Sequence, residues 1–493
     1  MIRIGIDLGT TNSCVAFHDG KTLEVIDMAD GRKTLPSVVS FMPDGEVIVG
    51  SGALEQVKKN TEFTFQHVKR LMGQPFRDNV NMGPQIAEGP DGGAWLKGRD
   101  RLYAPQEISA LILKEMKQAA EERIGKKVDG AVIGVPAGFN PKQREATIEA
   151  AKMAGFKQVD IEEEPTAAAI AYGLDKDKFR TLAVFDMGGG TFDIAIMEVG
   201  RGHHKPLGLP LGHMRLGGIN FDQEIANWVV EHHKDETGVD ISKKPFTMTL
   251  LQESAEESKR TLSRRPKADG RVGFAYTDND GKPQHVEYQI TKEELEDLTE
   301  HLVGEALEIC ASCLKQADRE QAQIDDVILI GGMTRMPMVQ GAVQAFFGRK
   351  PLKNINPDEA VARGCAIKAA IKDGRIAASH EETTDASFGI ETATGAFLPV
   401  IPRGSPFGTE KSVEVMTARD GQEVMAIGIY QGDELMAAEN VQIGDYRHHV
   451  PAGHAGESWL RLDWRVGSDG LLTVTVTDEV AGTAPVVIVG GDP

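Results

Sequence analysis

The chain has 493 residues, of which 41% are hydrophobic and 26% charged, a composition that is ordinary for globular proteins and allows about two or three domains. Its formal net charge of −20 argues against a general affinity for nucleic acid, and no apolar run reaches the length of a membrane span. An apolar strand begins at Ile2, which leaves no room for a signal peptide, and the few cysteines suit a reducing compartment. We therefore expect a cytoplasmic protein that does not bind membranes.

The first predicted element is a strand, a glycine-rich turn and a second strand. The apolar run 4–6 ends at Asp7, residues 9–12 form a polar turn, and residues 14–17 are apolar again. This order is typical of a hairpin and not of a strand that leads into a helix. The turn therefore matches neither a Walker A loop nor the dinucleotide fingerprint, which both precede a helix.

A similar hairpin recurs in the middle of the chain. The apolar run 181–185 ends at Asp186, residues 188–190 are glycines, and Thr191 and Asp193 precede a second apolar run. Backbone N–H groups of a glycine turn can approach phosphate oxygens, and carboxylates beside a phosphate favour a cation between them. One such turn alone fits a simple tight hairpin equally well. Two of them predict two similar half-domains that face one nucleotide.

Strands and helices alternate through most of the chain, which predicts an α/β architecture. Asn220 is a candidate N-cap of the helix that follows residues 216–218. Cys310 and Cys313 form a C-x-x-C inside a helical pattern, and without a second pair nearby we expect helix packing there and no metal or redox role. Other predicted helices cover residues 63–71, 107–125, 141–154, 166–172, 250–263 and 360–372.

The pattern changes after Asp373. Residues 374–386 are polar and acidic and are typical of a linker. Beyond them the hydrophobic period becomes two, for example over 459–466 and 472–477, and Asp-Gly turns separate short strands. The C-terminal part is therefore predicted to be an all-β domain.

The ordered motifs of this chain resemble the 70-kDa heat-shock protein family of DnaK-type chaperones. The resemblance spans nearly the whole chain and implies an actin-like α/β ATPase domain with two RNase H-like lobes, followed by an all-β sandwich. It places the ATPase domain at 1–373, the linker at 374–386 and a substrate-binding-like β-sandwich without a helical lid at 387–493. The motifs are residues 5–15, 164–174, 185–193, 216–218, 259–263, 331–335 and 356–361.

The resemblance also implies roles for individual residues. Lys69 would reach the γ-phosphate, Glu164 would orient the attacking water, and Asp193 and Thr191 would complete the catalytic group. Asp7 and Asp186 would hold Mg²⁺ through its waters. The nucleotide contacts implied by motif position are Thr10, Thr11, Asn12, Gly188, Gly189, Gly190, Gly217, Gly218, Glu256, Lys259, Arg260, Ser263, Gly331, Gly332, Arg335 and Asp358.

Two further groups follow from the same resemblance. Pro136 and Arg144 match the pair that couples the nucleotide to the second domain. The peptide pocket of the β-domain would be formed by Phe388, Ile390, Val415, Met425 and Ile427. Because sandwiches bury alternate residues, an alternative is that these five side chains form only the sandwich core.

The implied function is an ATP-dependent chaperone that serves protein folding and the stress response. Slow hydrolysis of ATP to ADP and phosphate, with Mg²⁺ and optionally K⁺, would control the binding of hydrophobic peptide segments or unfolded protein. A nucleotide-exchange factor is a candidate partner. Dependence on a J-domain cochaperone is not expected, because Asp160 stands where the family has a basic contact.

Other departures and alternatives remain open at this point. The linker lacks the leucine run of the family, and the absence of a lid predicts rapid release of peptide. A nucleotide-switched adaptor, whose β-domain binds one folded partner, is an alternative. A metabolite kinase of the same superfamily is a third, disfavoured by the β-domain.

Overall fold

The structure is a computed structural model that describes residues 2–78, 85–173, 178–200, 203–278, 280–352, 356–376, 384, 386–467, 471–478 and 486–490. The chain divides into two compact units, Met1–Ser379 and His380–Pro493, and each is considered by itself below. Residues 377–383 and 385 of the predicted linker lie outside the described residues.

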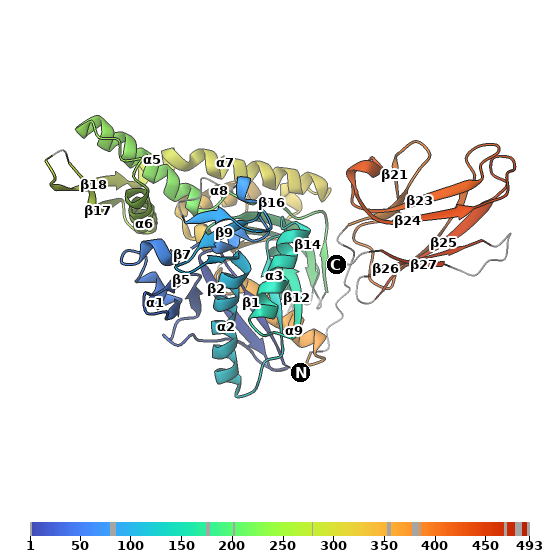
Figure 1. Ribbon diagram of the computed structural model, residues 1–493, viewed down its shortest axis with the longest axis horizontal. Helices are drawn as coiled ribbons and strands as arrows, with labels where there is room; N and C mark the ends of the chain where they lie inside the picture. Colours follow the sequence, from blue (N-terminus) through green and yellow to red (C-terminus); the bar gives the residue numbers. More distant parts are fainter. Residues whose placement is uncertain are drawn as a thin grey trace. The chain divides into compact units, whose positions relative to one another are not determined.

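The first half of the N-terminal unit is built on a mixed sheet (Figure 1). β1 pairs in antiparallel fashion with β2 and in parallel with β11, so that the first predicted hairpin lies beside a crossover strand. The strands in spatial order are β12 (Gln158–Glu163), β11 (Gly130–Val135), β1 (Arg3–Asp7), β2 (Asn12–His18) and β3 (Leu23–Val25), with β4 (Thr34–Pro36) beside β2.

The second half repeats this arrangement. The hairpin β13–β14 again has its third strand beside the second and a parallel strand beside the first. The strands in spatial order are β15 (His203–Pro206), β14 (Phe192–Gly200), β13 (Arg180–Met187) and β19 (Asp326–Ile330), with β16 (Leu211–His213) beside β14. The repeated strand order is the three-dimensional counterpart of the two similar glycine turns in the sequence.

Two helices fill the space between these sheets. α9 (Ala360–Lys372) packs on β1, and α4 (Glu164–Gly173) packs on α9 and on β14. The contacts are so close that side chains would not fit: a Cβ on Gly5 would lie 2.0 Å from the nitrogen of Ala366, and one on Gly364 only 1.7 Å from the carbonyl oxygen of Ala167. The glycines and alanines of α4 and α9 therefore set the distance between the two sheets.

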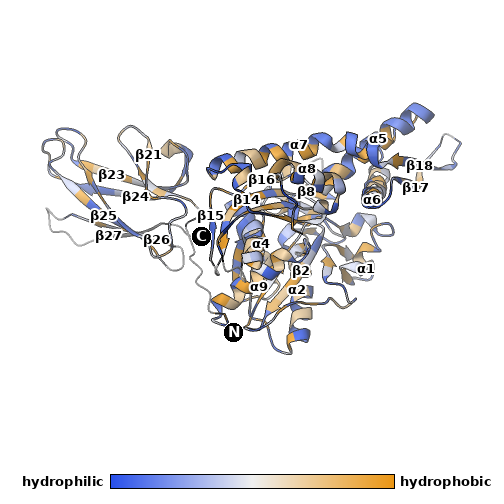
Figure 2. Cartoon of the chain, turned by 180° about the vertical axis from the view of Figure 1, so that it is seen from behind, coloured by the Kyte–Doolittle hydropathy of each residue, from blue (hydrophilic) through white to orange (hydrophobic). Residues whose placement is uncertain are grey.

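The outer helices cover the remaining faces. The C-terminal end of α5 is largely hydrophilic in Figure 2, as expected for a solvent-facing end. Cys310 and Cys313 are buried on α7, in agreement with helix packing. These helices are α1 (Ser51–Leu54), α2 (Pro105–Ile124), α3 (Pro141–Met153), α5 (Gly218–Thr237), α6 (Pro245–Leu262), α7 (Lys292–Gln316) and α8 (Pro337–Phe347).

Smaller elements complete the unit. The predicted helix over 63–71 is wrong: this stretch forms the 3₁₀ turn η1 (Thr61–Phe63), the strand β7 (Thr64–Phe65) and the 3₁₀ turn η2 (Val68–Leu71). The remaining elements are η3 (Phe76–Asp78), η4 (Gln321–Gln323), η5 (Gly332–Arg335), β5 (Val39–Phe41), β6 (Val47–Val49), β8 (Ile86–Glu88), β9 (Ala94–Lys97), β10 (Leu102–Tyr103), β17 (Lys267–Thr277) and β18 (Pro283–Thr291).

The C-terminal unit consists of two antiparallel four-stranded sheets. Trp464, Leu462 and Leu460 are fully buried on one face of β25, which confirms the alternation seen in the sequence. The sheets contain β21 (Phe397–Ile401), β20 (Phe388–Glu391), β23 (Val424–Gln431) and β24 (Val441–His449), and β22 (Glu410–Met416), β25 (Trp459–Val466), β26 (Leu472–Thr477) and β27 (Val486–Gly490), with η6 (Ala437–Glu439) between β23 and β24.

Candidate functional site

A cavity of about 1000 Å³ in the N-terminal unit brings together most of the residues that the motifs singled out. Both glycine turns, the C-terminal part of α6 and the segment around η5 line it. The predicted residues on its wall are Asp7, Thr10, Thr11, Asn12, Lys69, Glu164, Asp186, Gly188, Gly189, Thr191, Gly218, Glu256, Lys259, Arg260, Ser263, Gly331, Gly332, Arg335 and Asp358.

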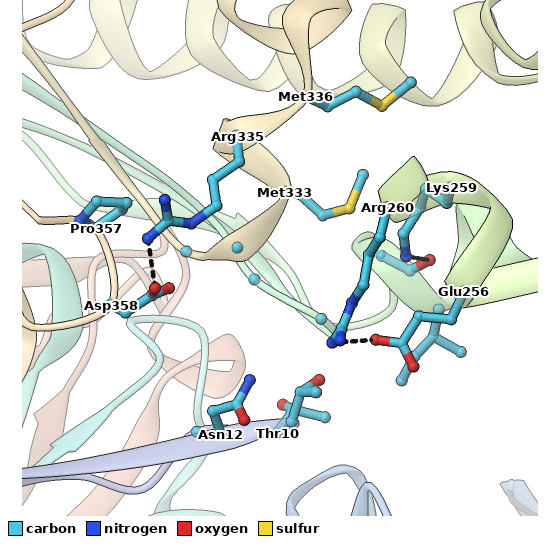
Figure 3. A pocket seen from close by; sticks show the side chains of 18 of the residues that line it. Thr10, Asn12, Glu256, Lys259, Arg260, Met333, Arg335, Met336, Pro357 and Asp358 are labelled. Atoms are coloured by element: carbon cyan, nitrogen blue, oxygen red, sulfur yellow. Dashed lines mark hydrogen bonds and ion pairs between the residues drawn. The ribbon is translucent and has the colours of Figure 1, made fainter. Parts of the chain in front are cut away.

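The first glycine turn is supported from within its own half. The hydroxyl of Ser37 donates to the carbonyl oxygen of Gly9 at 2.7 Å, and the N–H of Ser37 donates to the carbonyl oxygen of Thr11 at 2.8 Å. The hydroxyl of Ser13 lies 2.9 Å from that of Ser37. These contacts leave the side chains of Thr10 and Asn12 facing the cavity (Figure 3).

The second glycine turn rests on the N-terminus of α5. The N–H groups of Gly218 and Ile219 donate to the carbonyl oxygens of Gly188 at 3.0 Å and Gly189 at 2.8 Å. Asn220 was predicted to cap α5, but the cap position is Gly217, and the Asn220 side chain accepts the N–H of Gly217 at 3.2 Å. The orphan donors of a helix start thus hold the carbonyls of the turn.

Lys69 and Glu164 form an ion pair at the centre of the site. The Nζ of Lys69 donates to Oε1 of Glu164 at 2.6 Å, and both side chains are more than nine-tenths buried. Burial alone would lower the pKa of Lys69, but the carboxylates of Glu164, Asp7 and Asp186 hold that pKa above its usual value. Lys69 is therefore charged at neutral pH and is placed on η2, although no α-helix forms there.

The carboxylates around Lys69 outnumber it. Burial and the neighbouring Glu164 raise the pKa of Asp7 to about 7, and burial together with Glu164 raises the pKa of both Asp186 and Asp193 well above the ordinary range. Such crowding of acidic groups raises each pKa because like charges disfavour ionisation. A divalent cation would relieve this repulsion.

The donor set suits a hydrated metal ion better than a fully protein-bound one. Among the described residues, no group of three or more His, Cys, Asp or Glu side chains could hold a metal directly. Asp7 and Asp186 come from the ends of β1 and β13, one from each half, and both line the cavity. Mg²⁺ loses water reluctantly and is commonly held by one or two carboxylates together with substrate oxygens, so the two side chains fit this ion.

The other end of the cavity is lined by two arginines, each held by a carboxylate. Arg335 contacts Asp358 at 2.5 Å, and Arg260 contacts Glu256 at 2.6 Å. Figure 3 shows the two guanidinium groups at the border of the same space, that of Arg335 beside Asp358 and that of Arg260 beside Glu256. Planar guanidinium groups stack well on aromatic rings, so this end suits a flat base.

Three of the residues predicted to act at the nucleotide do not line the cavity. Asp193 is buried, and its Oδ1 accepts the N–H of Gly138 at 3.4 Å. Gly217 packs against the second turn, since a Cβ there would lie 2.8 Å from the nitrogen of Gly190. Gly190 itself has its carbonyl turned away, toward Arg70. Direct contact of these three residues with a ligand stays a prediction, because none of them lines the cavity.

The predicted coupling pair is not part of the cavity wall and follows the C-terminal end of β11, with Pro136 directly after the strand and Arg144 on α3. Arg144 contacts Glu163 at 2.9 Å and the carbonyl oxygen of Ala137 at 3.2 Å, while the carbonyl of Pro136 accepts the N–H of Phe139 at 3.1 Å. Arg144 thus ties α3 to β12, the strand that precedes Glu164. Their coupling role stays a prediction.

Asp160, the acidic departure on β12, is engaged within the N-terminal unit. It accepts a hydrogen bond from Lys372 of α9 at 2.9 Å, and Arg3 of β1 lies 3.7 Å from its other oxygen. The carboxylate therefore ties β12 to α9 and β1. The expectation that the protein does not depend on a J-domain cochaperone stays a prediction.

The five predicted peptide-binding residues lie in the C-terminal unit. Phe388, Ile390, Met425 and Ile427 are all buried in the core between the two sheets, and Val415 is half-buried against it. Their burial follows the alternation of the strands and agrees with the alternative of a structural core. Their contact with a peptide stays a prediction.

Some residues of the site have no counterpart in the sequence-based prediction. Asp222 of α5 pairs with Lys259 at 2.6 Å, and His67, Met333 and Met336 also line the cavity. Burial raises the pKa of Asp222 to about 6, which the nearby Lys259 partly offsets. The pairing depends on the packing of α5 on α6, so only the proximity of Asp222 to residues 216–218 could have drawn attention to it.

None of the helices in the described part combines the length and the apolar character that a membrane crossing needs. A family model described as Hsp70 protein matches residues 3–490 of the chain.

Proposed function

The chain belongs to the Hsp70 family, whose members are ATPases with a chaperone function, and we propose that it is an ATP-driven chaperone of the DnaK type. In this proposal ATP binds in the cavity between the two glycine turns and is hydrolysed slowly by water. The nucleotide state then controls whether the C-terminal unit holds a hydrophobic peptide segment or releases it, which is a coupling free energy between two sites.

The observation that carries this proposal is the cavity itself. It joins two backbone turns suited to phosphates, a buried lysine, a surplus of carboxylates and a pair of carboxylate-held arginines. Backbone N–H groups and a lysine suit a triphosphate, carboxylates suit a hydrated divalent cation, and guanidinium groups can stack on a base. The volume of about 1000 Å³ exceeds that of many small-molecule pockets and leaves room for all three parts.

In the proposed mechanism the residues act by position and charge. The glycine turns would hold phosphate oxygens through backbone N–H groups, and Arg260 and Arg335 would stack on the base. Glu164 would orient the attacking water, and Lys69 would stabilise the negative charge that develops on the γ-phosphate. Asp7 and Asp186 would hold Mg²⁺ through its waters, and this ion would neutralise charge on the phosphates.

The proposal is tested with the full chain and two measurements. Calorimetry with MgATP should detect binding of one nucleotide, and a fluorescent hydrophobic peptide should bind with an affinity that differs between ATP and ADP. Absence of nucleotide binding would refute the ATPase part. Nucleotide binding without any peptide binding in either state would refute the chaperone part alone.

A nucleotide-switched adaptor is the second candidate. The burial of Phe388, Ile390, Met425 and Ile427 in the sandwich core favours it, because a filled core offers these side chains to no ligand. In that case the C-terminal unit would bind one folded partner through its surface. Capture of a single stoichiometric partner that excess hydrophobic peptide does not displace would favour the adaptor.

A nucleotide-exchange factor is proposed as a partner, and dependence on a J-domain protein is not proposed. The stress-response role and the cytoplasmic location stay predictions.

A further inference from the structure

Arg70 is a cation beside the site that none of the predicted roles uses. It follows Lys69 on η2, whose Val68 and Leu71 belong to the core of the first half. Its Nη2 donates to the carbonyl oxygen of Gly190 at 3.2 Å and approaches Oδ1 of Asn220 at 3.5 Å. Both acceptors belong to the second half, so Arg70 joins the two halves next to the second glycine turn.

The guanidinium of Arg70 has neutral acceptors only. In the part of the chain that the structure describes, no carboxylate forms an ion pair with it, whereas its neighbour Lys69 is paired with Glu164. Burial and the positive charge of Arg215 lower the pKa of Arg70 to about 10, so it still carries its charge at neutral pH. An uncompensated, largely desolvated cation is favourable mainly where an anion is to be bound.

The position of Arg70 has a direct consequence for the backbone of the turn. The carbonyls of Gly188 and Gly189 are held by the N–H groups that begin α5, and that of Gly190 is held by Arg70. In a trans peptide the C=O and the following N–H point in opposite directions. The N–H groups of Gly189, Gly190 and Thr191 are therefore turned away from α5 and Arg70.

That opposite side is the cavity. Gly189 and Thr191 line it, and a Cβ on Gly189 would lie 2.2 Å from the hydroxyl oxygen of Thr11, across from the turn. Consecutive N–H groups that converge on one side form a concave anion-binding nest. The last of the three carbonyls, and with it the N–H of Thr191, depends on one side chain from the other half of the unit.

We propose that Arg70 is a positioning residue for the phosphates: by holding the carbonyl of Gly190 it directs the second glycine turn toward the ligand, and it adds positive charge behind the turn. This inference rests on the proposed nucleotide function and goes beyond it by assigning the alignment of the turn to a residue of the opposite half. Arg70 acts through the turn and does not itself line the cavity.

The proposal predicts a graded dependence on the phosphates of the ligand. Arg70→Met keeps the length of the side chain but removes the hydrogen bond and the charge. The affinity for MgATP should fall by about 10- to 100-fold, the range expected for loss of a charge-assisted hydrogen bond. The affinity for MgADP should fall less, and that for adenosine should be almost unchanged, because a nucleoside does not reach the turn.

The experiment is calorimetry of the full chain with MgATP, MgADP and adenosine. Arg32→Met is the matched control, because Arg32 lies in the same half with a largely exposed side chain. Arg70→Lys is a second variant that keeps the charge without the planar fork, so its MgATP affinity should lie between those of the wild type and Arg70→Met. Adenosine binding also reports whether each variant is folded.

The outcomes separate this inference from the proposed function. If the wild type binds no nucleotide, the proposed function is refuted and the inference with it. If the wild type binds MgATP but Arg70→Met weakens adenosine as much as MgATP, Arg70 has a merely structural role. If the MgATP affinity of Arg70→Met equals that of Arg32→Met, Arg70 does not position the turn.

Discussion

The two glycine turns of the N-terminal unit are alike in sequence but are supported in different ways. The first is held by Ser37, which belongs to the same half and contacts the carbonyls of Gly9 and Thr11. The second is held by the start of α5 and by Arg70, which comes from the opposite half. The first turn is thus complete within its own half, whereas the second needs both halves in place.

This difference gives the two turns different tasks in the proposed reaction. A turn with local support keeps its shape whether the halves are close together or apart. The second turn has the contact of its Gly190 carbonyl with Arg70 only when η2 and α5 are close. In the proposed switch, a ligand that binds the second turn would favour the arrangement in which the two halves are close.

The largest expected effect concerns Lys69, which pairs with Glu164 and supports neither turn by a hydrogen bond of its side chain among the described residues. Lys69→Ala should slow single-turnover hydrolysis of ATP by about 100- to 1000-fold, because one preorganised charge is lost at the γ-phosphate. ATP binding should change little, since many other contacts hold the ligand. Lys33→Ala, at an exposed lysine of the same half, is the control. An unchanged single-turnover rate would contradict the role of Lys69.

The next effect tests the support of the second turn. In Gly217→Ala the new Cβ would lie 2.8 Å from the nitrogen of Gly190 and 2.9 Å from the carbonyl oxygen of Gly188, both backbone atoms that cannot move aside. Overpacking of this kind costs about 1–3 kcal/mol, and MgATP affinity should fall by about tenfold or more.

Gly218→Ala is the matched control for this substitution. The atoms nearest to its Cβ would belong to side chains and not to backbone: Nζ of Lys259 and Sδ of Met333, each at 3.0 Å. Side-chain ends can give way more easily than backbone, so calorimetry should show a clearly smaller loss of MgATP affinity. Equal losses in both variants would mean that the second turn does not depend on its contact with Gly217.

A substitution that weakens the support of the first turn should lower the stability of the protein more than it changes the preference for ATP over ADP. Ser37→Ala leaves the carbonyl of Gly9 without its side-chain donor and should lower the free energy of unfolding by about 1–3 kcal/mol in a denaturant titration. The ratio of ATP to ADP affinity should stay near that of the wild type. Ser13→Ala retains the bond from Ser37 to Gly9 and should lose less stability. A strong change in the ratio of ATP to ADP affinity in Ser37→Ala would contradict the view that the first turn contributes mainly to stability.

The smallest effect is expected at the start of α5. Asn220→Ala removes the acceptor for the N–H of Gly217 and one of the two acceptors of Arg70. Loss of such a capping contact costs about 0.5–1 kcal/mol, which corresponds to a decrease of about two- to fivefold in MgATP affinity. If the MgATP affinity of Asn220→Ala decreased as much as that of Gly217→Ala, Asn220 would support the second turn more strongly than its long hydrogen bonds to Gly217 and Arg70 indicate.

The sequence by itself determined the elements that depend on local chemistry. The runs that end at Asp7 and Asp186 are strands followed by hairpin turns, α9 covers the predicted residues, and the period of two after Asp373 is a β-structure. Apolar periodicity and turn residues act over a few neighbouring positions, so they can be read without knowing the fold. The family resemblance assigned Lys69 and Glu164 to one catalytic group, and the structure pairs them although 95 positions separate them in the sequence.

Only the tertiary structure decided how these parts are supported. The contacts of Ser37 with the first turn, of α5 and Arg70 with the second, and of Asp222 with Lys259 join segments whose proximity no local pattern encodes. Only the tertiary structure likewise shows that Asp193 is buried and that Phe388 lies in the core of the sandwich, because the type of a side chain does not determine whether it faces a ligand or the core. The physical reason is that packing and hydrogen bonding between distant segments depend on the whole arrangement of the chain.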